Sequence, residues 1–391
     1  MSGLRGNTAI VGIGETQVGR LPGADSFDLA GRVAAQAVAD AGLTMDEIDG
    51  LICGGSLVDD MYMYAARLGA HLGIAPGYST VLPLGGSTFC HAIIEAELVL
   101  GAGLAKAVLV IAADYLLSGL GPQGSIDRFE AFQDPELERP YGFMMPAVYA
   151  MAARRHMLLY GTTREQLAQV AVSARRHAGL NPLAHYRKPL SLSDVVSAPE
   201  VATPLGLFDC SPISDGAGAF IVVAADRAGD CAKKPVYVLG AAEAHAHEYS
   251  SRLREITRSA IGPCGRDAFD ATGLSPADVG FAEIYDCFTI TTLVTLEDLG
   301  FCAKGEGGAF VEAGNIELGG ELPVNTHGGL LSHGHPGSPA GIFHIVEAVK
   351  QIRREVEPVR QVSTPLVGLV SGNSGMLRDM AVLLLGEDRN G

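Results

Sequence analysis

Two stretches of the chain repeat one pattern: Ala37-Val-Ala-Asp-Ala-Gly-Leu-Thr-Met-Asp-Glu-Ile-Asp-Gly-Leu51 and Ala268-Phe-Asp-Ala-Thr-Gly-Leu-Ser-Pro-Ala-Asp-Val-Gly-Phe-Ala282. Each predicts the end of a helix, a glycine stop at Gly42 or Gly273, an acidic turn, and then an apolar strand. The copies stand at equivalent places in halves of similar length, which indicates a duplicated α/β unit.

The segments around the first copy extend this pattern. Residues 8–15 and 48–53 predict apolar strands, and residues 26–41 predict an amphipathic helix. Residues 90–100 are apolar nearly all round, which is typical of a buried helix. Residues 107–113 are aliphatic throughout, as in a strand covered on both faces, and we also expect an edge strand near Ala107. Alternating strands and helices predict a layered α/β sheet.

The chain divides where composition changes. Residues 224–235 form a polar stretch that ends in proline between two apolar strands, so we expect a first half of residues 1–235 and a second half of residues 236–391. Within the first half, residues 116–197 are richer in Gly, Pro, Tyr, Met and Arg and predict a helical and loop insertion. This insertion carries much of the positive charge; it is either a solvated surface or a lid that binds an anionic ligand.

Bulk properties exclude several classes of protein. A net charge of −16 makes a nucleic-acid or anionic-membrane partner unfavourable. The first residues lack a signal-peptide core, and no apolar run reaches membrane-spanning length. Seven cysteines without a CxxC pair favour reduced thiols over disulfides or a zinc site. We therefore expect a soluble, cytoplasmic protein.

The segment Asn325-Thr-His-Gly-Gly-Leu-Leu-Ser-His-Gly-His-Pro-Gly-Ser-Pro-Ala-Gly341 cannot be a plain helix or strand. A zinc site of His327, His333 and His335 is one interpretation, but their spacing fits no structural zinc pattern and no carboxylate or thiol lies nearby in sequence. We favour a catalytic histidine in a rigid glycine-rich loop, and no metal.

A second polar group follows the repeated strand of the second half. Tyr285, Asp286 and Cys287 stand between that strand and the next predicted helix, a usual position for α/β active sites. Asp286 is expected to cap the helix and Cys287 to fill core, whereas Tyr285 is a candidate for chemistry.

These segments together resemble the thiolase superfamily, most closely its sterol-carrier-protein-type, thiolase-like branch. Residues 325–341 are similar to the thiolase Gly-His-Pro loop, residues 285–288 to the loop that binds the thioester oxygen, and residues 203–219 to the strand and turn that close the first half. The resemblance covers nearly the whole chain. It implies two similar halves, each a mixed sheet covered by helices, in a five-layer α-β-α-β-α fold with the buried helix at the centre.

Two departures from thiolases concern the catalytic thiols. The nucleophilic cysteine of thiolases falls on Gly86, which cannot carry an acyl group. Cys90 lies about one helical turn deeper, where a buried packing role is the simpler interpretation. The acid/base cysteine falls on or beside Ser371, and a hydroxyl with its much higher pKa substitutes poorly for that thiol.

A site with acid/base groups and no nucleophile suits retro-aldol cleavage of a 3-hydroxyacyl-CoA. Thiolase-like aldolases of steroid side-chain breakdown resemble this chain in having Tyr at position 285, but they carry Tyr where this chain has His335. We predict Tyr285 as proton donor and His335 as stabiliser of the enolate. Two alternatives remain: an acyltransferase that uses another thiol such as Cys90, and a non-catalytic acyl-CoA or lipid carrier.

The resemblance also implies ligands and partners. The CoA thioester is expected as substrate, with no further cofactor, together with a homodimer and a small OB-fold, zinc-ribbon partner protein. Predicted substrate-binding residues come from the two departing segments, the glycine-rich loop and the insertion: Gly86, Ser87, Asn325, Ser371, Asn373, Arg154, Arg155 and Arg187.

Overall fold

A computed structural model describes residues 4–130, 132–142, 144–246 and 255–389. Its main sheet runs in the order β10-β11-β12-β9-β2-β8-β5-β3-β4, and the short β1 (Leu4–Arg5) also pairs with β9. The first half supplies β2 (Thr8–Glu15), β3 (Gly50–Cys53), β4 (Tyr78–Val81), β5 (Ala107–Tyr115) and β8 (Asp215–Ala224). The second half supplies β9 (Val236–His245), β10 (Phe281–Ile284), β11 (Val367–Ser374) and β12 (Asp379–Gly386).

The two halves build their parts of the sheet in the same way. In the first, β3 and β5 are parallel, while β8 is antiparallel to both β5 and β2. In the second, β10 and β11 are parallel, and β12 is antiparallel to both β11 and β9. A short antiparallel contact between β2 and β9 joins the halves. The expected pair of mixed sheets is therefore present, connected edge to edge.

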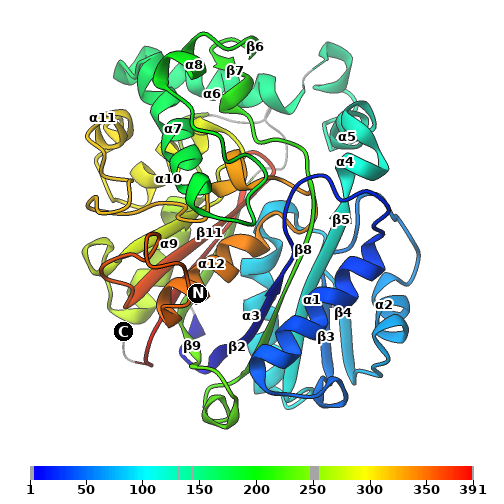
Figure 1. The fold of residues 1–391 in the computed structure, drawn as a ribbon. Coiled ribbons are helices and arrows are strands. Elements are labelled where there is room, and N and C mark those ends of the chain that lie inside the picture. Colours follow the sequence, from blue (N-terminus) through cyan, green and yellow to red (C-terminus); the bar gives the residue numbers. More distant parts are fainter. Residues whose placement is uncertain (1–3, 131, 143, 247–254, 390–391) are drawn as a thin grey trace.

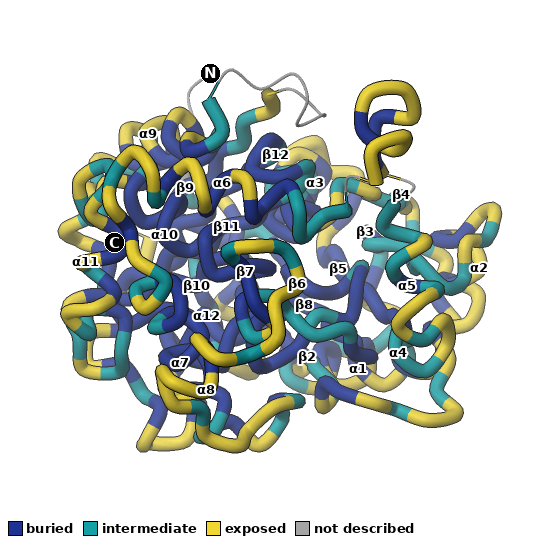
Figure 2. The backbone as a smooth tube through the Cα atoms, turned by 90° about the horizontal axis from the view of Figure 1, so that it is seen from above, coloured by how far each residue is buried: buried dark blue, intermediate teal, exposed yellow. Residues whose placement is uncertain are grey.

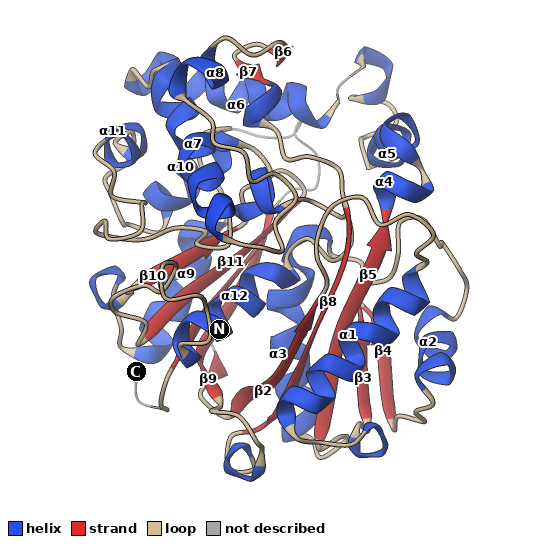
Figure 3. Cartoon of the chain, in the orientation of Figure 1, coloured by secondary structure: helices blue, strands red, loops and turns tan. Residues whose placement is uncertain are grey.

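Helices complete the layers that the resemblance implied. The helices α3 (Thr88–Gly101) and α12 (Ile342–Arg353) lie at the centre and contact strands of both halves (Figure 1). On the outer faces, α1 (Ser26–Ala41) and α2 (Tyr64–Leu72) cover the first half, and α9 (Ile261–Thr272) covers the second (Figure 3). The buried helix and its counterpart thus lie side by side, as predicted.

The repeated sequence adopts one local structure twice. Gly42 and Gly273 each end a helix in the left-handed conformation, with φ of 71° and 77°. In the turn that follows, the carboxylate of Glu47 accepts the backbone N–H of Thr44. In the second copy, the carboxylate of Asp278 accepts the backbone N–H of Ser275 in the same way. The strands β3 and β10 begin directly after these turns.

One expectation about the sheet was wrong. The strand β5, which begins at Ala107, lies between β3 and β8 and is not an edge. The edge of the first half is β4. An aliphatic strand signals burial on both faces, but it does not reveal whether hydrogen-bonding neighbours lie on both sides.

The insertion is mainly helical and covers one end of the sheet (Figure 1). Its helices are α4 (Leu116–Gly119), α5 (Gly121–Glu130), α6 (Met145–Tyr160), α7 (Arg164–Leu180) and α8 (Leu192–Val196), and a small pair of strands follows, β6 (Glu200–Ala202) and β7 (Leu205–Gly206). Two further helices, α10 (Thr289–Asp298) and α11 (Gly307–Glu312), pack against α7. Buried backbone concentrates in the sheet and central helices (Figure 2). None of the described helices has the length and apolar character that a membrane crossing needs.

The central helix offers a direct test of this layering. Ile93 of α3 is fully buried between the halves, whereas Leu98 of the same helix is 57% exposed. We predict that Ile93→Ala lowers the free energy of unfolding by about 2–5 kcal/mol, because it leaves a cavity in the core. Urea unfolding followed by circular dichroism measures this loss. Leu98→Ala should change the same quantity little, and equal losses for both variants would contradict a central position for α3.

Candidate active site

A cavity of about 610 Å³ lies where the carboxyl ends of the strands meet the insertion. Its walls come from both halves: Gly86 in the turn just before α3, Tyr285 after β10, His335 in the glycine-rich loop, and Asn373 in β11. The insertion adds apolar side chains, so most of the lining is hydrophobic with a few polar groups. This is the usual composition of a small-molecule site.

Tyr285 and His335 meet at the centre of the polar part of this wall. The Oη atom of Tyr285 lies 2.9 Å from Nε2 of His335, and the two rings meet edge to face. The His335 backbone is held on both sides, since its N–H donates to the Pro212 carbonyl and its carbonyl accepts from the Ser214 N–H. The structure thus brings the two predicted catalytic residues into contact.

Hydrogen bonding and burial define the protonation of this pair. Nδ1 of His335 accepts the backbone N–H of Gly337 at 3.3 Å, so the proton of a neutral imidazole resides on Nε2 and points at Tyr285. Burial lowers the pKa of His335 to about 4 and raises the pKa of Tyr285 well above its ordinary value. At neutral pH both groups are uncharged, and the phenol proton of Tyr285 is free to be donated into the cavity.

Gly86 and Tyr285 share one small volume. A Cβ atom at position 86 would lie 2.3 Å from Cζ of Tyr285 and 2.3 Å from the backbone oxygen of Asn373. Carbon contacts this short do not occur, so any side chain at position 86 must displace the ring or the strand. The ring of Tyr285 therefore fills the space that a nucleophilic cysteine side chain would need.

The cysteines near the site are protonated thiols. Cys90 is 2% exposed in the core face of α3, it does not line the cavity, and burial raises its pKa. Cys287 and Cys210 do line the cavity, and burial raises the pKa of each to about 12. Because the thiolate is the nucleophilic form, none of the three is prepared for covalent catalysis.

Hydrogen bonds tie the Tyr285 loop to the glycine-rich loop. The side-chain amide of Asn325 makes two hydrogen bonds with the backbone of Ile284. It accepts the Ile284 N–H at 2.6 Å and donates to the Ile284 carbonyl at 2.9 Å. Asp286 accepts the N–H of Leu330 at 2.6 Å, at a π-helical turn of that loop and not at the helix it was expected to cap. Asn325 was predicted to bind substrate, but it lies outside the cavity wall and orients the strand end before Tyr285.

The other predicted substrate-binding residues divide between the cavity and its surroundings. Asn373 lines the cavity, and its amide donates to Oη of Tyr149 at 3.2 Å. Ser87 lies behind the wall, where its hydroxyl donates to the Leu84 carbonyl at 3.0 Å. Ser371 is buried in β11 and does not reach the cavity.

The predicted arginines do not contribute to the cavity wall. Arg154, Arg155 and Arg187 are exposed and lie outside the lining. Arg128 of α5 does line the cavity and pairs with Asp60 at 3.0 Å. Tyr149 of α6 is a second phenol in the wall, stacked on Phe288 at 4.3 Å between ring centroids. Neither residue could be identified from the sequence, because no local motif marks which face of an inserted helix turns toward the site.

Comparison with known proteins places the chain among thiolase-like enzymes. Residues 242–387 match the family described as thiolase C-terminal domain-like. An acetyl-CoA acetyltransferase of Methanothermobacter thermautotrophicus is 34% identical over 94% of this chain and 96% of its own. A 17-hydroxy-3-oxo-4-pregnene-20-carboxyl-CoA lyase of Mycobacterium tuberculosis is 35% identical over 96% of this chain and 99% of its own. The solved structure of an Ltp2-ChsH2(DUF35) aldolase superposes with a TM-score of 0.87 and 34% identity, covering 98% of both chains.

The pKa of His335 yields a prediction for its titration. In ¹⁵N-labelled protein followed by NMR, the signal of His335 should titrate with a midpoint near 4. The loss of this signal in His335→Gln assigns it. Since the unfolded chain binds this proton more readily, the contribution of His335 to stability should decrease as pH falls from 6.5 toward 4.

His245 provides the matched control for that titration. It is half-exposed, and its hydrogen bond to Asp379 raises its pKa. Its signal should therefore titrate above 6.5, opposite in direction to His335. A midpoint for His335 at or above that of an ordinary histidine would contradict the neutral pair described here.

Proposed function

The chain belongs to the thiolase superfamily, and we propose that it is a carbon–carbon lyase that cleaves a 3-hydroxyacyl-CoA by a retro-aldol reaction, without an acyl-enzyme. The contact between Gly86 and Tyr285 carries this proposal, because the same ring that removes the place for a nucleophile delivers a phenol to the cavity. The acetyltransferase relative would allow the alternative of acyl transfer, but Cys90 is sealed in the core and cannot take over the nucleophile's part.

The proposed reaction needs no net proton. The 3-hydroxyl loses its proton as the Cα–Cβ bond breaks, and the thioester enolate gains one at Cα. Because the phenol of Tyr285 is protonated, Oη gives its proton to the enolate carbon in the same step in which it receives the proton of the 3-hydroxyl. The N–H of His335 Nε2 stabilises the negative charge that develops on Oη while the protons move. From the sequence we expected His335 to stabilise the enolate directly; because its Nε2–H is directed at Oη, we now propose that it acts through Tyr285.

The shape of the cavity supports a bulky apolar acyl group. Its wall includes Met61, Phe129, Met145, Phe288 and Met376, which offer contact area and few hydrogen bonds. The name of the Mycobacterium tuberculosis lyase gives a pregnene, a ring system, as the acyl part of its CoA thioester. We propose that this chain acts on a polycyclic or similarly large acyl-CoA, with Arg128 better placed than the exposed arginines to meet an anionic part of the substrate.

We also retain two proposals about assembly. The Ltp2-ChsH2(DUF35) aldolase structure supports a partner of the DUF35 kind, and large apolar side chains are exposed on the surface around residues 62–63 and 132–141. A homodimer formed through the edge strand β4 is the second proposal.

The catalytic pair is tested by two substitutions. Tyr285→Phe and His335→Ala should each reduce kcat/KM at least a hundredfold, within the range of about 10²–10⁴ that general acid–base groups contribute. Release of an aldehyde or ketone and of the shortened acyl-CoA is followed by liquid chromatography and mass spectrometry. Cys90→Ala should stay within a few-fold of wild type, a rough allowance for altered packing.

Intact-protein mass spectrometry after incubation with acyl-CoA distinguishes the proposed lyase from an acyltransferase and from a carrier. The proposal expects no acyl adduct and clear product release. A trapped acyl group on Cys90 together with an inactive Cys90→Ala would establish an acyltransferase, and binding without turnover, by this chain alone or with a DUF35-type partner, would establish a carrier.

The shared volume of Gly86 and Tyr285 gives a separate prediction. Gly86→Ala should lower lyase activity on the order of a hundredfold, because the added methyl displaces the Tyr285 ring and small displacements at a reacting centre cost about this much. The matched control is Gly101→Ala at the end of α3, where a Cβ atom meets nothing within 4 Å. Full activity of Gly86→Ala would show that the ring is not held where the mechanism needs it.

A further inference from the structure

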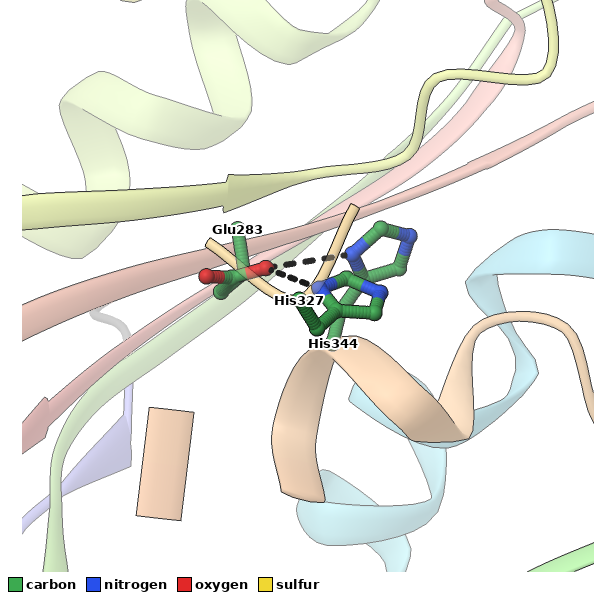
Figure 4. Close-up of side chains that lie close together, drawn as sticks. All are labelled: Glu283, His327 and His344. Carbon is green, nitrogen blue, oxygen red and sulfur yellow. Dashed lines mark ion pairs between the residues drawn. The ribbon is translucent and has the colours of Figure 1, made fainter. Parts of the chain in front are cut away.

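A second polar cluster lies behind the catalytic pair, apart from the cavity. It consists of Glu283 on β10, His327 in the glycine-rich loop and His344 in α12, all buried (Figure 4). One carboxylate oxygen of Glu283, Oε2, lies 2.8 Å from Nδ1 of His327 and 3.6 Å from Nδ1 of His344. One ligand atom from each of the three residues falls within 4.8 Å of the other two.

The cluster leaves its polar atoms without hydrogen bonds. Oε2 of Glu283 contacts Nδ1 of both imidazoles as ion pairs, without the geometry of a hydrogen bond, and Nε2 of His327 and of His344 finds no hydrogen-bond partner among the described residues. A buried polar atom without a hydrogen bond destabilises the fold. Several such atoms that face one another indicate a bound group that contacts all of them.

The other oxygen of the carboxylate is held in place. Oε1 of Glu283 accepts the backbone N–H of Thr326 at 3.1 Å and its hydroxyl at 3.0 Å. This fixes the carboxylate so that Oε2 faces the two imidazoles. Supporting hydrogen bonds of this kind orient the ligands at metal centres.

We propose that Glu283, His327 and His344 bind one divalent transition-metal ion of the zinc class. Two imidazole nitrogens and one carboxylate oxygen are ligands that zinc accepts, and ligands bonded at about 2.0–2.2 Å stand at separations comparable to those seen here. The zinc interpretation that the sequence suggested shares only His327 with this site. Of its other two members, His335 faces the cavity, and Nδ1 of His333 lies 3.2 Å from the side-chain amide nitrogen of Asn181.

The ion joins the three segments that carry the active site. Glu283 lies two residues before Tyr285, His327 lies in the loop that bears His335, and the ring of His344 lies 6.0 Å from the Tyr285 ring between centroids. A metal at this point therefore positions the Tyr285–His335 pair without touching the substrate. Its existence does not depend on which reaction the cavity supports.

The test measures metal in the full-length chain, purified without an affinity tag. Inductively coupled plasma mass spectrometry after dialysis should find about one zinc per chain, the stoichiometry of a single site. Removal of the metal with a chelator should lower Tm, and added zinc should restore it. Glu283→Gln and His344→Gln should lose the zinc. The control His91→Gln alters another histidine–carboxylate pair, with Glu243, which contributes nothing to this cluster, and should retain the zinc.

Two results would overturn the proposal: absence of stoichiometric zinc together with a Tm that zinc does not change, or zinc that persists in Glu283→Gln and His344→Gln. If those variants do not fold, cobalt substitution of the wild-type chain decides the question. A tetrahedral cobalt spectrum with nitrogen and oxygen ligands supports the site. A thiolate charge-transfer band would place the metal on a cysteine and overturn it.

Discussion

The contact of the Tyr285 ring with the backbone at Gly86 is the constraint on which the rest of the site depends. Nothing larger than hydrogen fits at position 86 while the ring remains in place. The ring in turn presents Oη to His335 at 2.9 Å and its remaining proton to the cavity. The absence of a side chain at position 86 and the position of the Tyr285 phenol are therefore a single feature of the packing, which is why the two residues have to be considered together.

This packing requires the two halves of the chain to approach each other closely. Gly86 lies in the turn just before the central helix α3 of the first half, while Tyr285 follows β10 and Asn373 lies in β11 of the second half. The central pair of helices sets the distance between the halves, and its apolar faces are fully buried. The packing that stabilises the centre of the molecule therefore also sets the geometry of the site.

Part of this arrangement could be predicted from the sequence. The glycine stops at Gly42 and Gly273 and the acidic turns after them are local signals, and the elements that they predicted are present in both halves. Tyr285 and His335 could be identified because each stands in a motif of its own. Arg128 and Tyr149 could not, because the rotation of an inserted helix over the cavity depends on long-range packing. The status of β5 as an inner strand likewise depends on its pairing with β8, which is distant in sequence.

The duplication explains why the site is asymmetric although the fold is not. Position 54 follows β3 as Tyr285 follows β10, yet it is glycine, and its carbonyl accepts a hydrogen bond from Ser338 of the glycine-rich loop at 2.7 Å. A Cβ atom there would meet the Phe89 ring and Ala112 at 2.9 Å. The first half thus contributes bare backbone at Gly54 and Gly86, and the second contributes the side chains of Tyr285 and His335. A side chain at position 54 has no room beside the Phe89 ring and Ala112, and one at position 86 has none beside the Tyr285 ring, so packing around both glycines keeps the first half from supplying side chains at these two places.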